Sequence, residues 1–251
     1  MSVVTTPAIL LRSHPYSETS RILRFYTRDA GVVAALARGI RKSGGKMGGP
    51  ERTFGEGRLT FYHKDTRDLQ TYQDFFLENP RRGLSTHPVV FAGASVLGEV
   101  VLQHAGSDSN PGLFLALSQG LDRLEASPPE SILPRILSEL WALVVELGYA
   151  PAVEACVICG QELEKEELGR FDFAAGGIRC PRCQEGNQGP RLGPRARDQL
   201  QRLIRGNLEG ELIRPRAHLR LASDFVTYHI SGGTSLRAIK VLATLIPRDH
   251  A

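Results

Sequence analysis

All four cysteines of this 251-residue chain lie in one stretch and form two Cys-x2-Cys pairs. The first pair is Cys156 and Cys159, the second is Cys180 and Cys183, and 20 residues separate the pairs. A two-residue spacing lets both thiolates of a pair reach one ion, and two pairs complete the tetrahedron that zinc prefers. Four thiolates leave no coordination position for water or substrate, so we expect one structural Zn²⁺ per chain.

The residues between the two pairs predict how the cysteines are brought together. Arg170–Phe173 and Ile178–Arg179 can form a hairpin that turns near Gly176 and Gly177, which indicates a zinc-ribbon-like insertion over residues 152–186. Disulfides would require an oxidising compartment. The N-terminus has no basic segment followed by a long apolar core, so we expect no signal peptide and a cytoplasmic protein.

The net charge of +4 is concentrated in the first third of the chain. Residues 1–80 contain 12 basic and 8 acidic side chains, whereas the remainder contains 19 of each. A local basic patch beside a neutral remainder favours a polyanionic partner, with nucleic acid as the first candidate. The alternative is a solvated surface loop.

The first 80 residues read as short strands with turn signals between most of them. The expected strands are Ala8–Arg12, Arg21–Thr27, Val32–Ala37, Arg58–Lys64 and Leu69–Leu77. Five short strands of this kind suit a small barrel such as an OB-fold. Alternation places Tyr62 on a face with Arg58, Thr60 and Lys64, and Tyr26 on a face with Arg24. Such faces suit single strands, because the cations follow the backbone and the rings stack on bases; the alternative is that the tyrosines pack against the helical domain.

The segment from Arg41 to Gly57 has six glycines and no apolar periodicity, so we expect a mobile basic loop. It contains no P-loop pattern, and its Gly-x-x-Gly at 45–48 is only a weak match to KH domains. Together with the strand faces, the loop gives the expected nucleic-acid-binding residues: Arg12, Arg21, Arg24, Tyr26, Arg38, Arg41, Lys42, Lys46, Arg52, Arg58, Tyr62 and Lys64.

From Asn79-Pro80 onward the apolar period changes to that of helices. The expected helices are Pro88–His104, Gly112–Ala126, Pro129–Gly148, Pro194–Arg205 and Ser235–Leu245. The sequence therefore predicts a multi-domain α+β protein, with an OB-fold barrel over residues 1–80 and an α-helical domain over residues 81–251 that contains the zinc insertion. Trp141 lies near the apolar stripe of its helix, so we expect it in the core.

No catalytic constellation stands out in the sequence. The seven histidines are scattered without metal-ligand spacing, and Ser95 lies in a predicted helix rather than a nucleophile elbow. A zinc-dependent hydrolase would need an open coordination position, which four thiolates do not provide. We therefore expect a binding protein rather than an enzyme.

Two stretches of the N-terminal region resemble the signature of the bacterial RecO family of recombination mediators. They are the Tyr-Ser-Glu-Thr-Ser-Arg-Ile-Leu run at 16–23 and the Ala-Arg-Gly-Ile-Arg-Lys run at 37–42. The resemblance extends through the strand layout, the helical second half and the four-cysteine insertion. It implies a nucleoid-associated protein that binds single- and double-stranded DNA and anneals complementary strands. It also implies that the protein works with RecR and single-stranded DNA-binding protein (SSB) to load RecA, and that RecF and RecA are further partners. An RNA-binding protein with a zinc ribbon is the other reading that composition leaves open.

Overall fold

The computed structural model describes residues 2–39, 53–106, 108–186 and 188–246, and the chain divides into two compact units, Met1–Ala126 and Ser127–Ala251. Each unit is described by itself. Within the described ranges, no helix combines the length and the apolar character needed to cross a bilayer.

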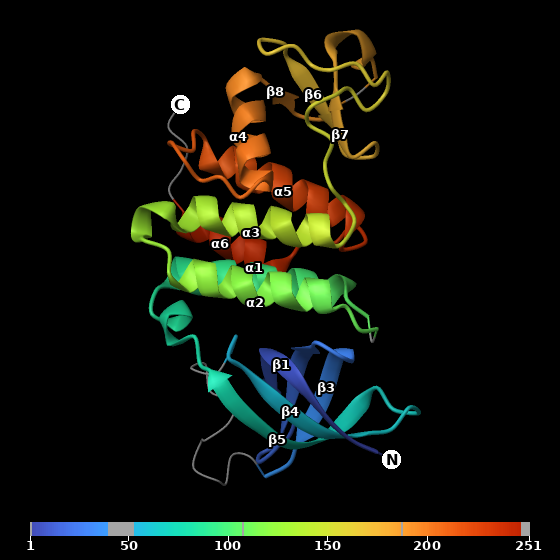
Figure 1. Ribbon diagram of the computed structural model, residues 1–251, viewed down its shortest axis with the longest axis vertical. Coiled ribbons are helices and arrows are strands. Elements are labelled where there is room, and N and C mark those ends of the chain that lie inside the picture. Colours follow the sequence, from blue (N-terminus) through green and yellow to red (C-terminus); the bar gives the residue numbers. More distant parts are fainter. Residues whose placement is uncertain (1, 40–52, 107, 187, 247–251) are drawn as a thin grey trace. The chain divides into compact units, whose positions relative to one another are not determined.

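Five strands of the first unit close into a barrel (Figure 1). The strands are β1 (Ser2–Pro15), β2 (Arg21–Thr27), β3 (Gly31–Ala37), β4 (Glu56–His63) and β5 (Leu69–Asn79). Their order around the barrel is β1-β2-β3-β5-β4, and the β3–β5 pair is parallel while the other pairs are antiparallel. This is the five-stranded Greek-key arrangement of an OB-type barrel, which confirms the predicted fold class.

Alternation along the strands fills the barrel interior. Leu23 and Phe25 of β2 point inward with Leu59 and Phe61 of β4, and all four side chains are buried in one apolar cluster. The ring of Phe75 from β5 lies 5.1 Å from that of Phe25. Because inward positions are apolar at every second residue, the opposite face of each strand is left for other contacts.

The first unit also contains two helices, α1 (Pro88–His104) and α2 (Pro111–Glu125), preceded by a 3-10 turn, η2 (Arg82–Ser85). Each helix has a proline in its first turn and a side-chain cap. The Asn110 side chain accepts a hydrogen bond from the backbone N–H of Leu113 at 2.9 Å. These local signals explain why both helices begin where the sequence predicts, to within one residue.

A buried arginine joins α2 to the barrel. The Arg81 side chain has no exposed surface and donates to the carboxylates of Glu56 and Asp122, each at 2.6 Å, and to the backbone carbonyl of Phe54 at 3.0 Å. It also donates to the hydroxyl of Ser118 at 2.9 Å. Every charge-bearing nitrogen of the guanidinium is thus satisfied, as burial of a charge requires.

The predicted mobile loop ends earlier than expected. Residues 53–57 belong to the barrel, because the backbone N–H of Phe54 donates to the carbonyl of Leu10 at 2.7 Å and β4 begins at Glu56. The Phe54 side chain is buried, with its ring 5.6 Å from that of Phe91. Aromatic burial therefore orders this end of the glycine-rich segment, which is a correction to the sequence-based expectation.

The second unit combines helices with a small sheet. Its helices are α3 (Ile132–Glu146), α4 (Pro194–Ile204), α5 (Pro215–His229) and α6 (Arg237–Leu245), and its strands are β6 (Gly169–Asp172), β7 (Gly177–Arg179) and β8 (Arg191–Leu192). Short 3-10 turns are η3 (Pro129–Ser131) and η4 (Pro181–Cys183). Trp141 is fully buried, with its ring 5.3 Å from that of Phe225, so its predicted core position is confirmed.

Helix α5 was not expected from the sequence. Its buried residues include Leu219, Ala222 and Val226, which have helical spacing, but charged and polar residues separate them. Buried His218 further interrupts the apolar stripe. The helix is stabilised by packing, since the ring of Phe225 contacts both Trp141 and Phe171, and such tertiary contacts are invisible to local periodicity.

Candidate metal centre and nucleic-acid surface

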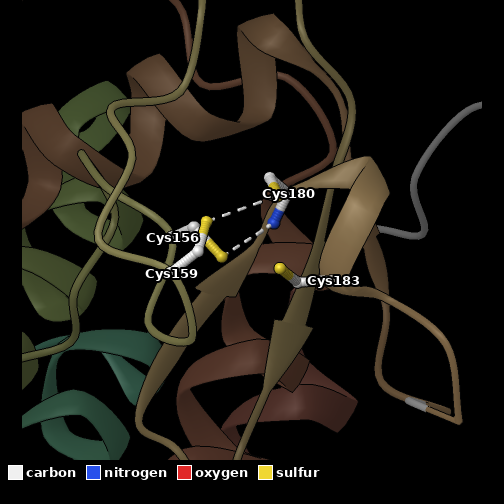
Figure 2. A group of neighbouring side chains, drawn as sticks. All are labelled: Cys156, Cys159, Cys180 and Cys183. Carbon is white, nitrogen blue, oxygen red and sulfur yellow. Dashed lines mark hydrogen bonds between the residues drawn. The ribbon is translucent and has the colours of Figure 1, made fainter.

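The four cysteines meet at one point of the second unit (Figure 2). Their Sγ atoms all lie within 4.8 Å of one another, and the Sγ atoms of Cys159 and Cys180 are 3.9 Å apart. Cys156 and Cys180 are buried, whereas Cys159 is exposed and Cys183 is half-buried. The sequence prediction that two distant pairs converge is therefore confirmed as geometry.

Backbone hydrogen bonds shape the turn that carries the first pair. The N–H of Cys156 donates to the carbonyl of Gln161, and the N–H of Gly160 donates to the carbonyl of Cys156, both at 2.8 Å. Gly160 has a φ of +71°, a conformation that a side chain would strain. In the second pair, the N–H of Cys183 donates to the carbonyl of Cys180 at 3.0 Å. Each pair is thus held in a tight turn that directs both sulfurs to the same side.

The predicted hairpin between the pairs is present. Strands β6 and β7 pair antiparallel, with Phe171 opposite Ile178, and both side chains are fully buried. The end of the hairpin lies very close to the first cysteine turn, because a Cβ on Gly177 would lie 2.5 Å from Cγ1 of Val157 and 2.3 Å from the carbonyl oxygen of Ala152. Only glycine allows that approach. The hairpin therefore positions Cys180 next to the Cys156 turn.

The donor set fits zinc. Four sulfurs at about 2.3 Å from a tetrahedral ion lie about 3.8 Å from each other, close to the 3.9 Å between Cys159 and Cys180. The same distance is far longer than the roughly 2.05 Å of a disulfide. All four cysteines are free thiols here, so the geometry favours a metal centre over the disulfide alternative.

Local hydrogen bonds favour the thiolate form of Cys156 even without a metal. Burial raises the pKa of Cys156, but backbone N–H groups of Cys180, Cys159 and Ile158 outweigh it and lower that pKa to about 6. Hydrogen bonding with Cys180, burial, and the Cys156 charge raise the pKa of Cys183 to about 12. Without a metal, the four cysteines cannot all be thiolates at neutral pH. A divalent cation would supply the positive charge that lets all four sulfurs lose their protons.

The barrel carries a second group of interest, a basic cluster on the β1–β2 hairpin formed by Arg12, His14, Arg21 and Arg24. Arg12 lies directly opposite Arg24 in the strand register. Arg24 faces outward, because its neighbours Leu23 and Phe25 point into the core. Arg21 donates through Nε to the Ser13 hydroxyl at 2.6 Å. The salt bridges found in the described ranges include none of these four residues.

Mutual repulsion within this basic cluster is visible in its pKa values. Burial, followed by the charges of Arg12, Arg24 and Arg21, lowers the pKa of His14. Burial and the neighbouring Arg12 lower the pKa of Arg24, although a guanidinium remains charged at neutral pH. The cluster is therefore a concentration of positive charge that a bound anion would relieve.

Four further residues that were predicted to bind nucleic acid lie in the described ranges. Two are on the outer face of β4, and two lie just beyond the ends of β4 and β3. Tyr62 is half-buried, Arg58 is exposed and pairs with Glu78 at 3.0 Å, and Lys64 is exposed beyond the strand end. Arg38 is exposed after β3. Their roles in binding stay predictions. Arg41, Lys42, Lys46 and Arg52 lie outside the described residues.

Tyr26 requires a correction. Alternation places it on the outer face of β2 as predicted, but its side chain is fully buried, with its ring 6.2 Å from that of Phe114 in α2. Its hydroxyl donates to the backbone carbonyl of Asn110 at 3.4 Å. A ring covered by a helix cannot stack on a base, so Tyr26 belongs to packing within the first unit.

Two residues of this surface were missed by sequence reasoning. His14 follows Arg12 on β1 and could have been found from that spacing. Phe76 is 66 % exposed and lies directly opposite Arg58 on β5. Its signal was the adjacent Phe75-Phe76 pair, since neighbouring residues of a strand point to opposite faces.

Fold and site together define an α+β protein with a five-stranded OB-type barrel, a helical region and a four-cysteine metal-binding centre. Two family models match the chain in the same order, recombination protein O N terminal over residues 1–80 and recombination protein O C terminal over residues 87–236. The chain belongs to the RecO family of DNA repair proteins, which confirms the resemblance noted in the sequence.

Individual relatives agree with the family models. The DNA repair protein RecO of Desulfatibacillum aliphaticivorans is 31% identical over 254 residues, covering 96% of this chain and 98% of the relative. The DNA repair protein RecO of Synechococcus sp. (strain JA-3-3Ab) is 34% identical over 201 residues. That match covers 73% of this chain and 64% of the relative, slightly less than two thirds of its length.

Proposed function

We propose that this protein is a non-catalytic DNA-binding mediator of recombinational repair. It binds single- and double-stranded DNA, anneals complementary strands and, with RecR, helps to load RecA onto single-stranded DNA coated with SSB. Membership of the RecO family supports this proposal, and the observation that carries it is the basic cluster of the β1–β2 hairpin, in which Arg12 and Arg24 lie opposite each other on the outer face of the barrel.

The chemistry of the basic cluster suits a phosphate backbone. Arg12 and Arg24 face each other across β1 and β2, so that their guanidinium groups present a paired set of donors without acidic neighbours in a salt bridge. Phosphate contacts fix a strand without reading its sequence. Such binding is what a protein needs if it is to accept any broken end and pair it with its complement.

The direct test combines strand binding with an annealing assay on complementary oligonucleotides, with and without SSB. We expect Arg12→Gln with Arg24→Gln to weaken binding to all sequences alike and to reduce the log–log salt slope by about 1.4, at about 0.7 per phosphate contact on single strands. Arg28→Gln is the matched control, because Arg28 is on the same barrel but pairs with Asp29 at 2.9 Å. Unchanged affinity and slope in the double variant would contradict the assignment.

The nature of the nucleic acid is tested separately. Matched DNA and RNA strands compete for the same protein, and we expect DNA to be preferred or equal. An RNA preference of tenfold or more, on the order of 1.4 kcal/mol, would favour the RNA-binding alternative. The partners RecR, SSB, RecF and RecA are tested by co-purification and by RecA loading onto SSB-coated strands.

A further inference from the structure

A cavity of about 1220 Å³ lies within the second unit, apart from the cysteine cluster. It is formed by β8 and the first turns of α4 and α5, which Figure 1 shows in the orange and red-orange part of the chain. Small-molecule sites are typically about 300–1,000 Å³. The cavity is therefore large enough for a segment of a polymer.

Arginines supply the cationic lining of this cavity. The lining includes Arg191, Arg195, Arg214 and Arg220, and it includes no lysine. In the described ranges, the first three have no ion-pair partner, and Arg220 is 3.9 Å from Asp224 with its side chain 86% exposed. Guanidinium groups match phosphate oxygens in a bidentate geometry. The cavity thus offers an anion several guanidinium groups whose charge no described carboxylate neutralises.

Acidic groups do not cancel this charge. Of the carboxylates in the lining, Asp172 is bonded to Arg179 and Asp224 is near Arg220, which leaves Glu166 facing the arginines. Helices α4 and α5 both begin at the cavity with no acidic residue in the first turn and no side-chain capping bond. Their N-terminal dipole ends add to the positive potential of the arginine cavity.

The walls are held in place by internal hydrogen bonds. Buried His218 of α5 is bonded to Gln199 of α4 at 3.1 Å. Buried Arg197 donates to the backbone carbonyls of residues 164, 165 and 167, and Arg170 donates to the carbonyl of Gly189 at 2.9 Å. Apolar side chains such as Phe173 and Leu221 also line the cavity, as a surface that receives base faces requires.

We propose that this arginine cavity binds the phosphate backbone of a second nucleic-acid strand, independently of the barrel. The inference rests on the proposed function, since annealing brings two strands together on one protein. It was hidden in the sequence, where residues 81–251 contain equal numbers of basic and acidic residues. Residues 188–220 alone contain eight arginines against three acidic residues.

The test compares three double variants of the full chain. The cavity variant is Arg195→Gln with Arg214→Asn, because Arg214 has a φ of 52° and asparagine tolerates that conformation. The matched control is Arg182→Gln with Arg205→Gln, which removes two exposed arginines that do not line the cavity. The barrel variant is Arg12→Gln with Arg24→Gln. Thermal unfolding of each variant verifies that it is folded.

The readouts are photo-crosslinking of a thiothymidine oligonucleotide, mapped by peptide, and the annealing rate. We expect cross-links in residues 188–221 for wild type, for the control and for the barrel variant, and their loss in the cavity variant. We also expect the cavity variant to anneal more slowly, on the order of tenfold, with its cross-links to the barrel retained.

Three results would overturn the inference. Cross-links to the barrel alone in wild type would remove the second site and leave the proposed function intact. Cross-links to neither region would remove the proposed function itself. A fluorescent poly-glutamate peptide that binds more tightly than oligo(dT), and loses binding in the cavity variant, would assign the cavity to an acidic peptide instead.

Discussion

His14 couples the charge of the barrel surface to pH. Burial and three neighbouring arginines lower its pKa, so the folded protein holds this proton less tightly than the unfolded chain does. Stability therefore rises with pH through the window from the lowered pKa up to about 6.5, and that contribution is lost as pH falls through the lowered value. A phosphate bound next to His14 would raise the pKa of His14 again, because its negative charge stabilises the imidazolium.

Binding of single strands should therefore take up a proton at His14. We expect affinity at constant ionic strength to rise as pH falls from about 8 to about 6, and His14→Gln to remove that part of the increase. Fluorescence anisotropy titrations at several pH values measure it. The same pH dependence in both proteins would show that the proton is taken up elsewhere.

Tyr62 tests base stacking where Tyr26 cannot. Its half-buried ring lies on the outer face of β4, across from Thr71 of β5. Stacking contributes roughly 1–3 kcal/mol per base, so Tyr62→Ala should weaken single-strand binding about tenfold and duplex binding much less. If Tyr62 instead packs against protein, the variant lowers the melting temperature and leaves the ratio of the two affinities unchanged. Both quantities are measured on one preparation.

At the scale of elements, Arg81 links the barrel to α2 through its ion pairs with Glu56 and Asp122. Replacement with methionine keeps an unbranched apolar stem but removes the guanidinium, which leaves the Glu56 carboxylate, 24% exposed, without its cation. We expect a loss of about 3 kcal/mol in the free energy of unfolding, since breaking one side of a buried pair costs about 3–5 kcal/mol and both carboxylates retain some solvent.

Urea unfolding measures this loss, with Arg28→Gln as the control on an exposed pair. The Arg28–Asp29 pair is half-exposed on both sides, and such pairs contribute about 0–1 kcal/mol. Equal destabilisation by the two variants would show that Arg81 contributes no more than a surface charge.

The four-cysteine centre is the element whose loss should affect folding more than binding. We expect about one zinc ion per chain, and Cys159→Ser to lower the ion content and the melting temperature while the DNA affinity of the surviving protein changes little. Ile158→Ser is a matched control, because Ile158 is exposed in the same turn and contributes no ligand. Elemental analysis of reduced protein purified without chelator measures the zinc content. A preparation without metal would contradict the assignment of the four cysteines as a zinc site.

At the scale of the whole molecule, the sequence predicted those elements whose residues show a local alternation or a regular spacing. The barrel strands could be predicted because apolar residues such as Leu59 and Phe61 alternate. The first two helices could be predicted because apolar residues such as Leu113 and Leu117 have helical spacing, and the hairpin because it lies between the two Cys-x2-Cys pairs. Alternation also placed Tyr26 on the outer face of its strand. It could not show that α2 covers that face, because coverage depends on residues distant in sequence.

The remaining differences have the same physical origin. Helix α5 depends on contacts of Phe225 with Trp141 and Phe171, and the arginine cavity depends on two helix starts meeting β8. The net charge of residues 81–251 is zero because acidic residues elsewhere in this range balance the arginines of residues 188–220. Tertiary proximity, rather than composition, gives the cavity its positive character.

The chain has one tryptophan, and it is built into the core of the second unit. The indole Nε1 of Trp141 is buried without a hydrogen-bond partner in the described part of the chain, and the ring of Phe225 lies 5.3 Å from the indole. Its emission should therefore be shifted to the blue in the folded state and move to the red as soon as water reaches the ring. The protein thus carries an intrinsic optical probe of melting in the unit Ser127–Ala251. After a chelator is added, the rate at which this signal changes would report how fast the core around Trp141 opens once the cysteine centre is kept free of metal.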